Sequence, residues 1–257
     1  MAWVTKDSVE QYNQTPEPQK QYTKKEKAAN WWHYNKLPVA IAVAVIVLVV
    51  WVVHDVVTQV RPDYRVGYVG RSDLPVDTVA ALENVLAGYV DDRNGDGKVV
   101  VQLVQYNADF SGETENTDTD PYSQMAGITR LSADLASTDG PFIYLMQNAE
   151  YAEQFEDYAG ALQYLDGTMP EEDDEKADWT KMVYRWTDCP VLMSLDLGTY
   201  TGLTLLDDTQ GESQDIMKDM YIGRRVYYDE KNQRASEAYD SLWNSLTAGA
   251  VSTAGQQ

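Results

Sequence analysis

Residues 39–53, VAIAVAVIVLVVWVV, are fifteen consecutive apolar residues, and no other stretch of the chain has so long an apolar run. A helix needs roughly 20 apolar residues, at about 1.5 Å per residue, to cross about 30 Å of hydrocarbon. Residues 37–57 supply that length if His54 and Asp55 lie at the outer headgroups. In water the run would be a buried strand, but it is longer than ordinary strands. Aromatic residues lie near its two ends, as at membrane interfaces: Trp31, Trp32 and Tyr34 before the run and Trp51 close to its end. The sequence therefore predicts one transmembrane helix at 37–57.

The charges on the two sides of this segment differ. Residues 1–36 carry six lysines and four acids, a net charge of +2, which leaves 37 acids and 14 bases, a net charge of −23, for the remainder. Lysine and arginine are enriched on the cytoplasmic side of membrane helices. We therefore expect residues 1–36 to be a cytoplasmic polar and basic tail, and residues 61–257 to be an acidic extracellular domain.

A cleaved signal peptide is the alternative interpretation of the apolar run. Signal peptides have a short basic start, and small residues at a cleavage site follow their apolar region. Here 36 residues precede residue 37, and the sequence after the run is HDVVTQ, which lacks small residues at A-x-A spacing. We therefore expect an uncleaved signal anchor in the cell membrane.

The composition of the outer part limits its partners. Its negative charge would repel nucleic acid and anionic membrane surfaces, and it suits basic partners or simply a solvated acidic surface. Cys189 is the only cysteine, so the chain can form no internal disulfide. Extracellular proteins of this size often contain disulfides. The lack of one is less unusual for a bacterial surface protein than for a secreted eukaryotic protein, so the composition favours a bacterial surface protein.

The outer part alternates between strand and helix patterns. Strands are expected at 64–70, 98–106 and 141–147, and helices at 74–90, 121–136 and 150–165, with a polar loop at 107–120. This alternation predicts a three-layer α/β domain with a mainly parallel sheet. The second half is less regular: it has an acidic loop at 166–178, strand candidates at 181–186, 190–195 and 220–228, and a final helix at 230–246.

Residues 64–165 resemble one lobe of a bacterial extracellular solute-binding protein. The resemblance is carried by a short strand with Gly67 and Gly70, the helix after it, and the strand PFIYLMQ running into NAEYAEQF. In that family the ends of such strands line the ligand cleft between two lobes. The resemblance implies binding residues that follow three strands: Arg71, Ser72, Asn107, Gln147 and Asn148. Complete members of that family usually run well beyond 200 residues, so here a second full lobe is expected to be missing or trimmed, unless a partner supplies it.

Two tryptophans near the acidic loop are further candidates for a binding surface. Trp179 follows Asp178, and Trp186 follows Tyr184 and Arg185. Aromatic side chains form platforms for sugars and peptides, although aromatics at helix or strand spacing more often belong to the core.

Residues 92–99, DRNGDGKV, form the sharpest local motif. The motif resembles the start of EF-hand and dockerin calcium loops, which implies side-chain ligands at Asp92, Asn94 and Asp96 and a carbonyl ligand at Lys98. Position 12 of the loop is Leu103, where those loops have a carboxylate. The alternative is a helix-to-strand turn built on Asn-Gly and Asp-Gly. Calcium is the one cofactor for which the sequence offers a candidate site.

No pattern in the chain indicates catalysis. The only two histidines, His33 and His54, flank the apolar run, so the outer domain has none for a Ser-His-Asp triad or a histidine-ligated zinc. A carboxylate pair, as in glycosidases, is spatial and leaves no sequence pattern. We expect a non-enzymatic domain that binds a small ligand or a protein partner outside the cell. The alternative is a structural or scaffolding subunit of a membrane assembly.

Overall fold

The computed structural model describes residues 22–58, 61–108, 110, 121–170, 177–202 and 210–255. The chain divides into two compact units, residues 1–59 and residues 60–257. Parts of several expected segments lie outside the described residues: most of the tail at 1–36, residues 109 and 111–120 of the polar loop, and residues 171–176 of the acidic loop.

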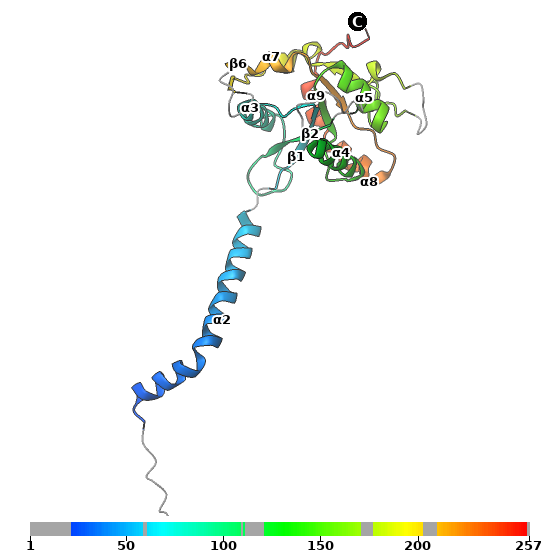
Figure 1. The fold of residues 1–257 in the computed structure, drawn as a ribbon. Helices are drawn as coiled ribbons and strands as arrows, with labels where there is room; N and C mark the ends of the chain where they lie inside the picture. The colour runs from blue at the N-terminus through cyan, green and yellow to red at the C-terminus, as the bar shows by residue number, and fades with distance from the viewer. Residues whose placement is uncertain are drawn as a thin grey trace, which may run out of the picture. The chain divides into compact units, whose positions relative to one another are not determined.

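The first unit contains one helix, α2 (Lys24–Thr58), of 35 residues. Thr23 and Glu26 close a capping box at its start: the Thr23 N–H donates to the Glu26 carboxylate at 2.8 Å, and the Glu26 N–H donates to the Thr23 hydroxyl at 3.3 Å. Pro38 lies inside the helix, and Figure 1 shows α2 bending in its first half, as an interior proline causes.

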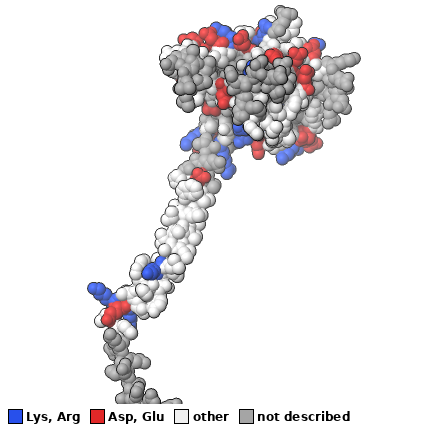
Figure 2. Space-filling view, viewed as in Figure 1, with Lys and Arg blue, Asp and Glu red and all other residues white. Residues whose placement is uncertain are grey.

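None of the most apolar window of α2 is buried. Figure 2 shows neither acidic nor basic side chains along the middle of the helix. Among the described residues, α2 is the one helix that is long and apolar enough to cross a membrane. The structure thus confirms the single long apolar helix near the N-terminus.

The second unit is built on a five-stranded sheet in the order β2-β1-β3-β7-β4. The strands are β1 (Tyr64–Gly70), β2 (Val101–Asn107), β3 (Ile143–Met146), β4 (Val183–Arg185) and β7 (Tyr221–Arg224). Strand β1 pairs in parallel with β2 and β3, whereas β7 pairs antiparallel with β3 and β4. Four of the five strands therefore run in one direction, which confirms a mixed α/β domain with a largely parallel sheet.

Two core clusters use alternate side chains of the strands. Val66 and Tyr68 of β1 pack with residues of α3 (Val76–Ala87) and α9 (Asp240–Leu246). Val69 of the same strand packs with residues of α4 (Pro121–Ala136) and α5 (Ala149–Ala159). Because successive strand residues point to opposite faces, both faces of the sheet are buried. Figure 1 shows α4 and α5 close to the sheet.

The remaining elements are short. They are the 3₁₀ turns η1 (Trp179–Lys181) and η2 (Trp186–Asp188), the helices α6 (Pro190–Met193), α7 (Ser213–Met217) and α8 (Glu230–Glu237), and the antiparallel pair β5 (Thr199–Thr201) and β6 (Gln210–Glu212).

Several of the expected elements differ from the structure, and four of the differences have a clear outcome. The helix expected at 150–165 ends earlier, because Gly160 adopts a left-handed conformation (φ 51°) that terminates α5. The strand expected at 190–195 is wrong: Pro190 starts the helix α6, a position that proline favours. The helix expected at 230–246 breaks between α8 and α9 near Tyr239. The strand expected at 98–106 begins only at Val101.

Candidate functional site

The ends of the three parallel strands meet at one edge of the sheet, as the sequence implied. Strand β1 lies between β2 and β3, and Gly70 pairs in register with Asn107. The main-chain N–H of Arg71 donates to Oε1 of Gln147 at 2.7 Å, which joins the ends of β1 and β3. The chain leaves β1 for β2 on one side and later returns to β3 on the other, so this edge is a topological switch point, where open α/β sheets bind ligands.

The switch point itself is closely packed. A side-chain carbon added at Gly70 would lie 2.4 Å from the hydroxyl of Tyr68 and 2.9 Å from Oε1 of Gln147. Arg71 and Ser72, which follow Gly70, are exposed. There is no room for a ligand between Gly70 and Gln147, so a ligand at this edge must bind in the cavities beside them.

One such cavity, of about 430 Å³, lies on the β3–β7–β4 side. It is lined by Asn148, Ala149, Arg185, Thr187, Lys218, Asp219 and Tyr221. Because β7 runs antiparallel to β3 and β4, its first residue, Tyr221, lies at the same edge as the last residues of those strands. We call this the carboxyl-edge cavity.

The start of α5 forms one wall of the carboxyl-edge cavity. Asn148 caps the helix: its Oδ1 accepts a hydrogen bond from the main-chain N–H of Tyr151 at 3.0 Å. The helix has 11 residues, so its first turn directs N–H groups and the positive end of a helix dipole toward this wall. Asn148 therefore contributes to the site mainly by fixing the helix terminus.

Two cationic side chains line the same cavity. The Nε of Arg185 donates to the Tyr221 hydroxyl at 3.0 Å, and its guanidinium carbon lies 5.8 Å from the centre of the Tyr221 ring. The ammonium of Lys218 forms an ion pair with Asp215. Asp219 adds a carboxylate to the lining. This combination suits a small polar ligand with an anionic group, because Arg185 can still present its terminal N–H groups as a fork.

Asn107 lines a different cavity, of about 520 Å³, between β2 and α4. Its Oδ1 is buried and has no hydrogen-bond partner among the described residues. Helix α4 approaches β2 very closely here, since a side-chain carbon added at Gly127 would lie 2.0 Å from the Asn107 carbonyl oxygen. Asp73 and Arg130 also line this cavity. The structure therefore does not bring Asn107 and Asn148 into one cavity.

The two tryptophans differ in their surroundings. Trp186 is only 1% exposed, lies in the core, and donates from Nε1 to Oε1 of Gln214 at 2.9 Å. Trp179 is half-buried, and its ring meets the Tyr221 ring edge-on with centroids 5.8 Å apart. Trp179 thus packs behind a residue of the carboxyl-edge cavity, while Trp186 presents no surface, and we leave Trp186 out of the proposed site.

The candidate calcium loop is held together by its own hydrogen bonds. The two carboxylate oxygens of Asp92 accept from the N–H groups of Gly95 and Gly97, both at 2.7 Å. Both glycines have positive φ, 74° and 84°, as the turn interpretation requires. Oδ1 of Asn94 accepts from the Asp96 N–H, and Oδ1 of Asp96 accepts from the Lys98 N–H, both at 2.9 Å.

Asp63, which the sequence analysis missed, closes this loop from outside. Its buried carboxylate accepts from the N–H groups of Arg93, Asn94 and Val100, each at 2.9 Å. Burial by itself raises the pKa of Asp63, but the N–H donors outweigh it and hold the pKa below its usual range.

The fit of calcium to the loop is partial. The loop offers carboxylates at Asp92 and Asp96 and an amide oxygen at Asn94, but position 12, Leu103, is buried in β2. Among the described residues, no three or more acidic, histidine or cysteine side chains gather into a possible metal site. The hydrogen bonds account for the shape of the loop, and calcium at Asp92, Asn94, Asp96 and the Lys98 carbonyl stays a prediction.

The chain matches no protein-family model, no curated protein and no solved structure. The resemblance of residues 64–165 to a solute-binding lobe and the absence of catalysis therefore also stay predictions. Sequence reasoning missed Thr187, Lys218 and Asp219 as cavity residues. No local signal could have found them: Lys218 and Asp219 reach the carboxyl edge because β7 starts there, and Thr187 reaches it because it follows β4, which pairs with β7.

Proposed function

We propose that this chain is a single-pass, membrane-anchored, non-enzymatic protein whose extracellular domain binds a small anionic ligand in the carboxyl-edge cavity. In this proposal residues 37–57 are the signal anchor, residues 1–36 face the cytoplasm, and residues 61–257 face the outside. The exposed apolar surface of α2 supports the anchor, because lipid would cover it. The charge difference between its two flanks supports the orientation.

The observation that carries the binding proposal is the set of groups around one cavity. Arg185 and Lys218 supply positive charge, and the first turn of α5 supplies N–H donors. They stand at the carboxyl ends of parallel strands, the usual binding edge of α/β sheets. A carboxylate or phosphate group of the ligand would bind Arg185, and Asp219 would favour a ligand that also carries an amine. The two core clusters support the finer proposal of a three-layer domain similar to a solute-binding lobe.

A panel of ligands tests the binding proposal directly. The full chain in neutral detergent is titrated by calorimetry with amino acids, dicarboxylic acids and small phosphate esters. We expect at least one class to bind, and Arg185→Gln to weaken that binding by about tenfold, as loss of one charged hydrogen bond does. The matched control is Arg234→Gln, which removes the same charge from an exposed position on α8.

Two outcomes would refute the binding proposal. One is that no member of the panel binds the wild-type chain, which would favour the scaffolding alternative. The other is that Arg185→Gln and Arg234→Gln weaken binding equally, which would mean that overall charge, and not the cavity, attracts the ligand.

A further inference from the structure

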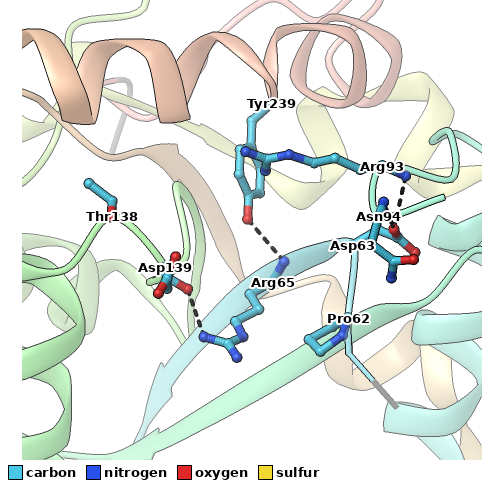
Figure 3. Close-up of a pocket in the computed structure, with 8 residues that line it drawn as sticks. All are labelled: Pro62, Asp63, Arg65, Arg93, Asn94, Thr138, Asp139 and Tyr239. Carbon is cyan, nitrogen blue, oxygen red and sulfur yellow. Dashed lines mark hydrogen bonds between the residues drawn. The ribbon is translucent and has the colours of Figure 1, made fainter. Parts of the chain in front are cut away.

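A third polar cavity, of about 280 Å³, lies at the opposite edge of the sheet, where β1 begins. It is lined by Pro62, Asp63, Arg65, Arg93, Asn94, Thr138, Asp139 and Tyr239, which Figure 3 draws as sticks. We call it the amino-edge cavity. Strand β1 has seven residues, so roughly 20 Å of strand separates it from the carboxyl edge.

Two arginines, Arg65 and Arg93, contribute positive charge to the lining of the amino-edge cavity. Nη1 of Arg65 donates to the main-chain oxygen of Asp139 at 2.7 Å, which fixes the guanidinium at the rim. The guanidinium of Arg93 lies over the Tyr64 ring, 6.0 Å from its centre. Within the described part of the chain, no carboxylate oxygen lies within 4.0 Å of either guanidinium, although five other basic side chains form such pairs.

The other lining groups are mainly donors or are already engaged. Both carboxylate oxygens of Asp63 accept main-chain N–H groups, so Asp63 does not hold either arginine side chain. The Tyr239 hydroxyl accepts from the Arg65 N–H at 3.1 Å, which leaves its own hydrogen to donate. Thr138 and Asn94 add a hydroxyl and an amide, while Asp139 is the one lining acid whose side chain these contacts do not occupy. Two guanidinium groups with nearby hydroxyl donors are the groups that recognise phosphate.

Covalent connection limits where this cavity can be. Pro62 is four residues after Thr58, the last residue of α2. Four residues span at most about 14 Å, whatever their conformation. If α2 crosses the membrane, the amino-edge cavity cannot move far from the lipid headgroups at the outer end of the helix. The tether then presents those headgroups at an effective concentration on the order of millimolar or higher, at which even a weak site is occupied.

We infer that the amino-edge cavity binds the phosphate group of an anionic membrane lipid through Arg65 and Arg93. This inference rests on the proposed membrane anchor. Binding there would turn the amino edge of the sheet toward the membrane and leave the carboxyl-edge cavity facing the surrounding medium. It would also give an otherwise strongly acidic domain a local point of attraction to an anionic surface.

The test uses the full chain in a neutral detergent, titrated with dihexanoyl phosphatidylglycerol and followed by native mass spectrometry. Dihexanoyl phosphatidylcholine and inorganic phosphate are titrated in parallel. The variant Arg65→Gln/Arg93→Gln is compared with Lys231→Gln/Arg234→Gln, which removes two positive charges from exposed positions on α8. We expect phosphatidylglycerol to bind more tightly than phosphatidylcholine, and the cavity variant alone to lose about tenfold in affinity.

Three results would overturn the inference. They are the absence of phosphatidylglycerol binding, equal weakening in both double variants, and inorganic phosphate binding as tightly as the lipid, which would make the cavity a site for free phosphate. A melting temperature measured for each variant identifies any loss of lipid affinity that comes from unfolding. Alkaline extraction of membranes that contain the Arg65→Gln/Arg93→Gln variant distinguishes a failure of this inference from a failure of the membrane-anchor proposal. We expect the variant to stay in the membrane. Its release would mean that the anchor proposal had failed.

Discussion

The main-chain N–H of Arg71 donates a 2.7 Å hydrogen bond to Oε1 of Gln147, two residues that are 76 positions apart in the sequence. The bond closes the switch point of the sheet over Gly70, which has no space for a larger residue. This explains why the cavities lie beside the switch point and not in it. The carboxyl-edge cavity is lined by Arg185 of β4 and Tyr221 of β7, so its shape depends on how these two strands are placed beside β3.

Gly70→Ala should destabilise the second unit. The added methyl group would lie 2.4 Å from the Tyr68 hydroxyl, and Tyr68 is buried and cannot move away freely. We expect a loss of about 1–3 kcal/mol in the free energy of unfolding, as for other overpacked sites. Urea unfolding of the full chain measures it, with Ser72→Ala at the exposed position nearby as the control. Equal stability of both variants would contradict the close packing.

Asp63→Asn should lower stability at neutral pH and matter less in acid. An amide cannot accept all three N–H groups, so at least one partly buried donor loses its partner, at a cost of about 1–3 kcal/mol. The folded state holds the pKa of Asp63 below its unfolded value. The unfolded chain therefore binds the proton more readily, so the stabilisation is present above the unfolded pKa and is lost as the pH falls through the folded one.

Denaturant unfolding at a series of pH values from 7 to 3 measures this effect. The stability gap between the wild-type chain and Asp63→Asn should narrow as the pH falls. Glu153→Gln, at an exposed position on α5, is the control and should show no such gap. A gap that is constant with pH would show that the charge of Asp63 does not hold the loop.

Arg225→Met should be strongly destabilising, because this buried arginine joins elements that are distant in the sequence. Its Nη1 donates to the carbonyl of Ser137 at 2.9 Å and, at a longer 3.3 Å, to that of Asp134 near the end of α4. Its guanidinium carbon lies 4.5 Å from the centre of the Phe142 ring. Removing the donor takes a hydrogen bond from the partly buried Ser137 carbonyl and a cation from the Phe142 ring, so we expect a loss of about 2–4 kcal/mol.

Thermal unfolding followed by circular dichroism compares Arg225→Met with Arg234→Met. Arg234 pairs with Glu230 on the helix surface, where such pairs contribute less than about 1 kcal/mol. If the two variants melted at the same temperature, Arg225 could not have the structural role given to it here.

Calcium should raise the melting temperature of the full chain if the loop at 92–99 binds it, because an ion that binds only the folded state stabilises that state. Asp92→Asn and Asp96→Asn keep an oxygen for the loop hydrogen bonds but remove charge from the site. We expect these variants to abolish the shift, with magnesium as the control ion. A melting temperature unaffected by calcium would leave the loop as a turn alone.

Local patterns in the sequence predicted much of the fold. The strand at 64–70 and the helix at 121–136 agree with β1 and α4 at both ends, because their apolar spacing is decided within a few residues. The early end of α5 could also have been found, since Gly160 is the kind of residue that ends a helix.

Contacts between distant residues could not be predicted in this way. Asp63 holds a loop that is 30 to 37 positions away, and nothing in its neighbours marks it for that task. The same is true of Lys218 and Tyr221, which reach the carboxyl-edge cavity because β7 inserts antiparallel between β3 and β4. The strand pattern shows that a strand exists, but its direction and its neighbours are set by the packing of the whole sheet.

The anchor at 37–57, with the acidic domain outside, is tested most directly by adding protease to intact cells that carry epitope tags at both ends of the chain. We expect that the C-terminal tag is lost, that the N-terminal tag is protected until the membrane is opened, and that the protected fragment resists alkaline extraction. A C-terminal tag that survives on intact cells, or a shortened chain released into the medium, would contradict it.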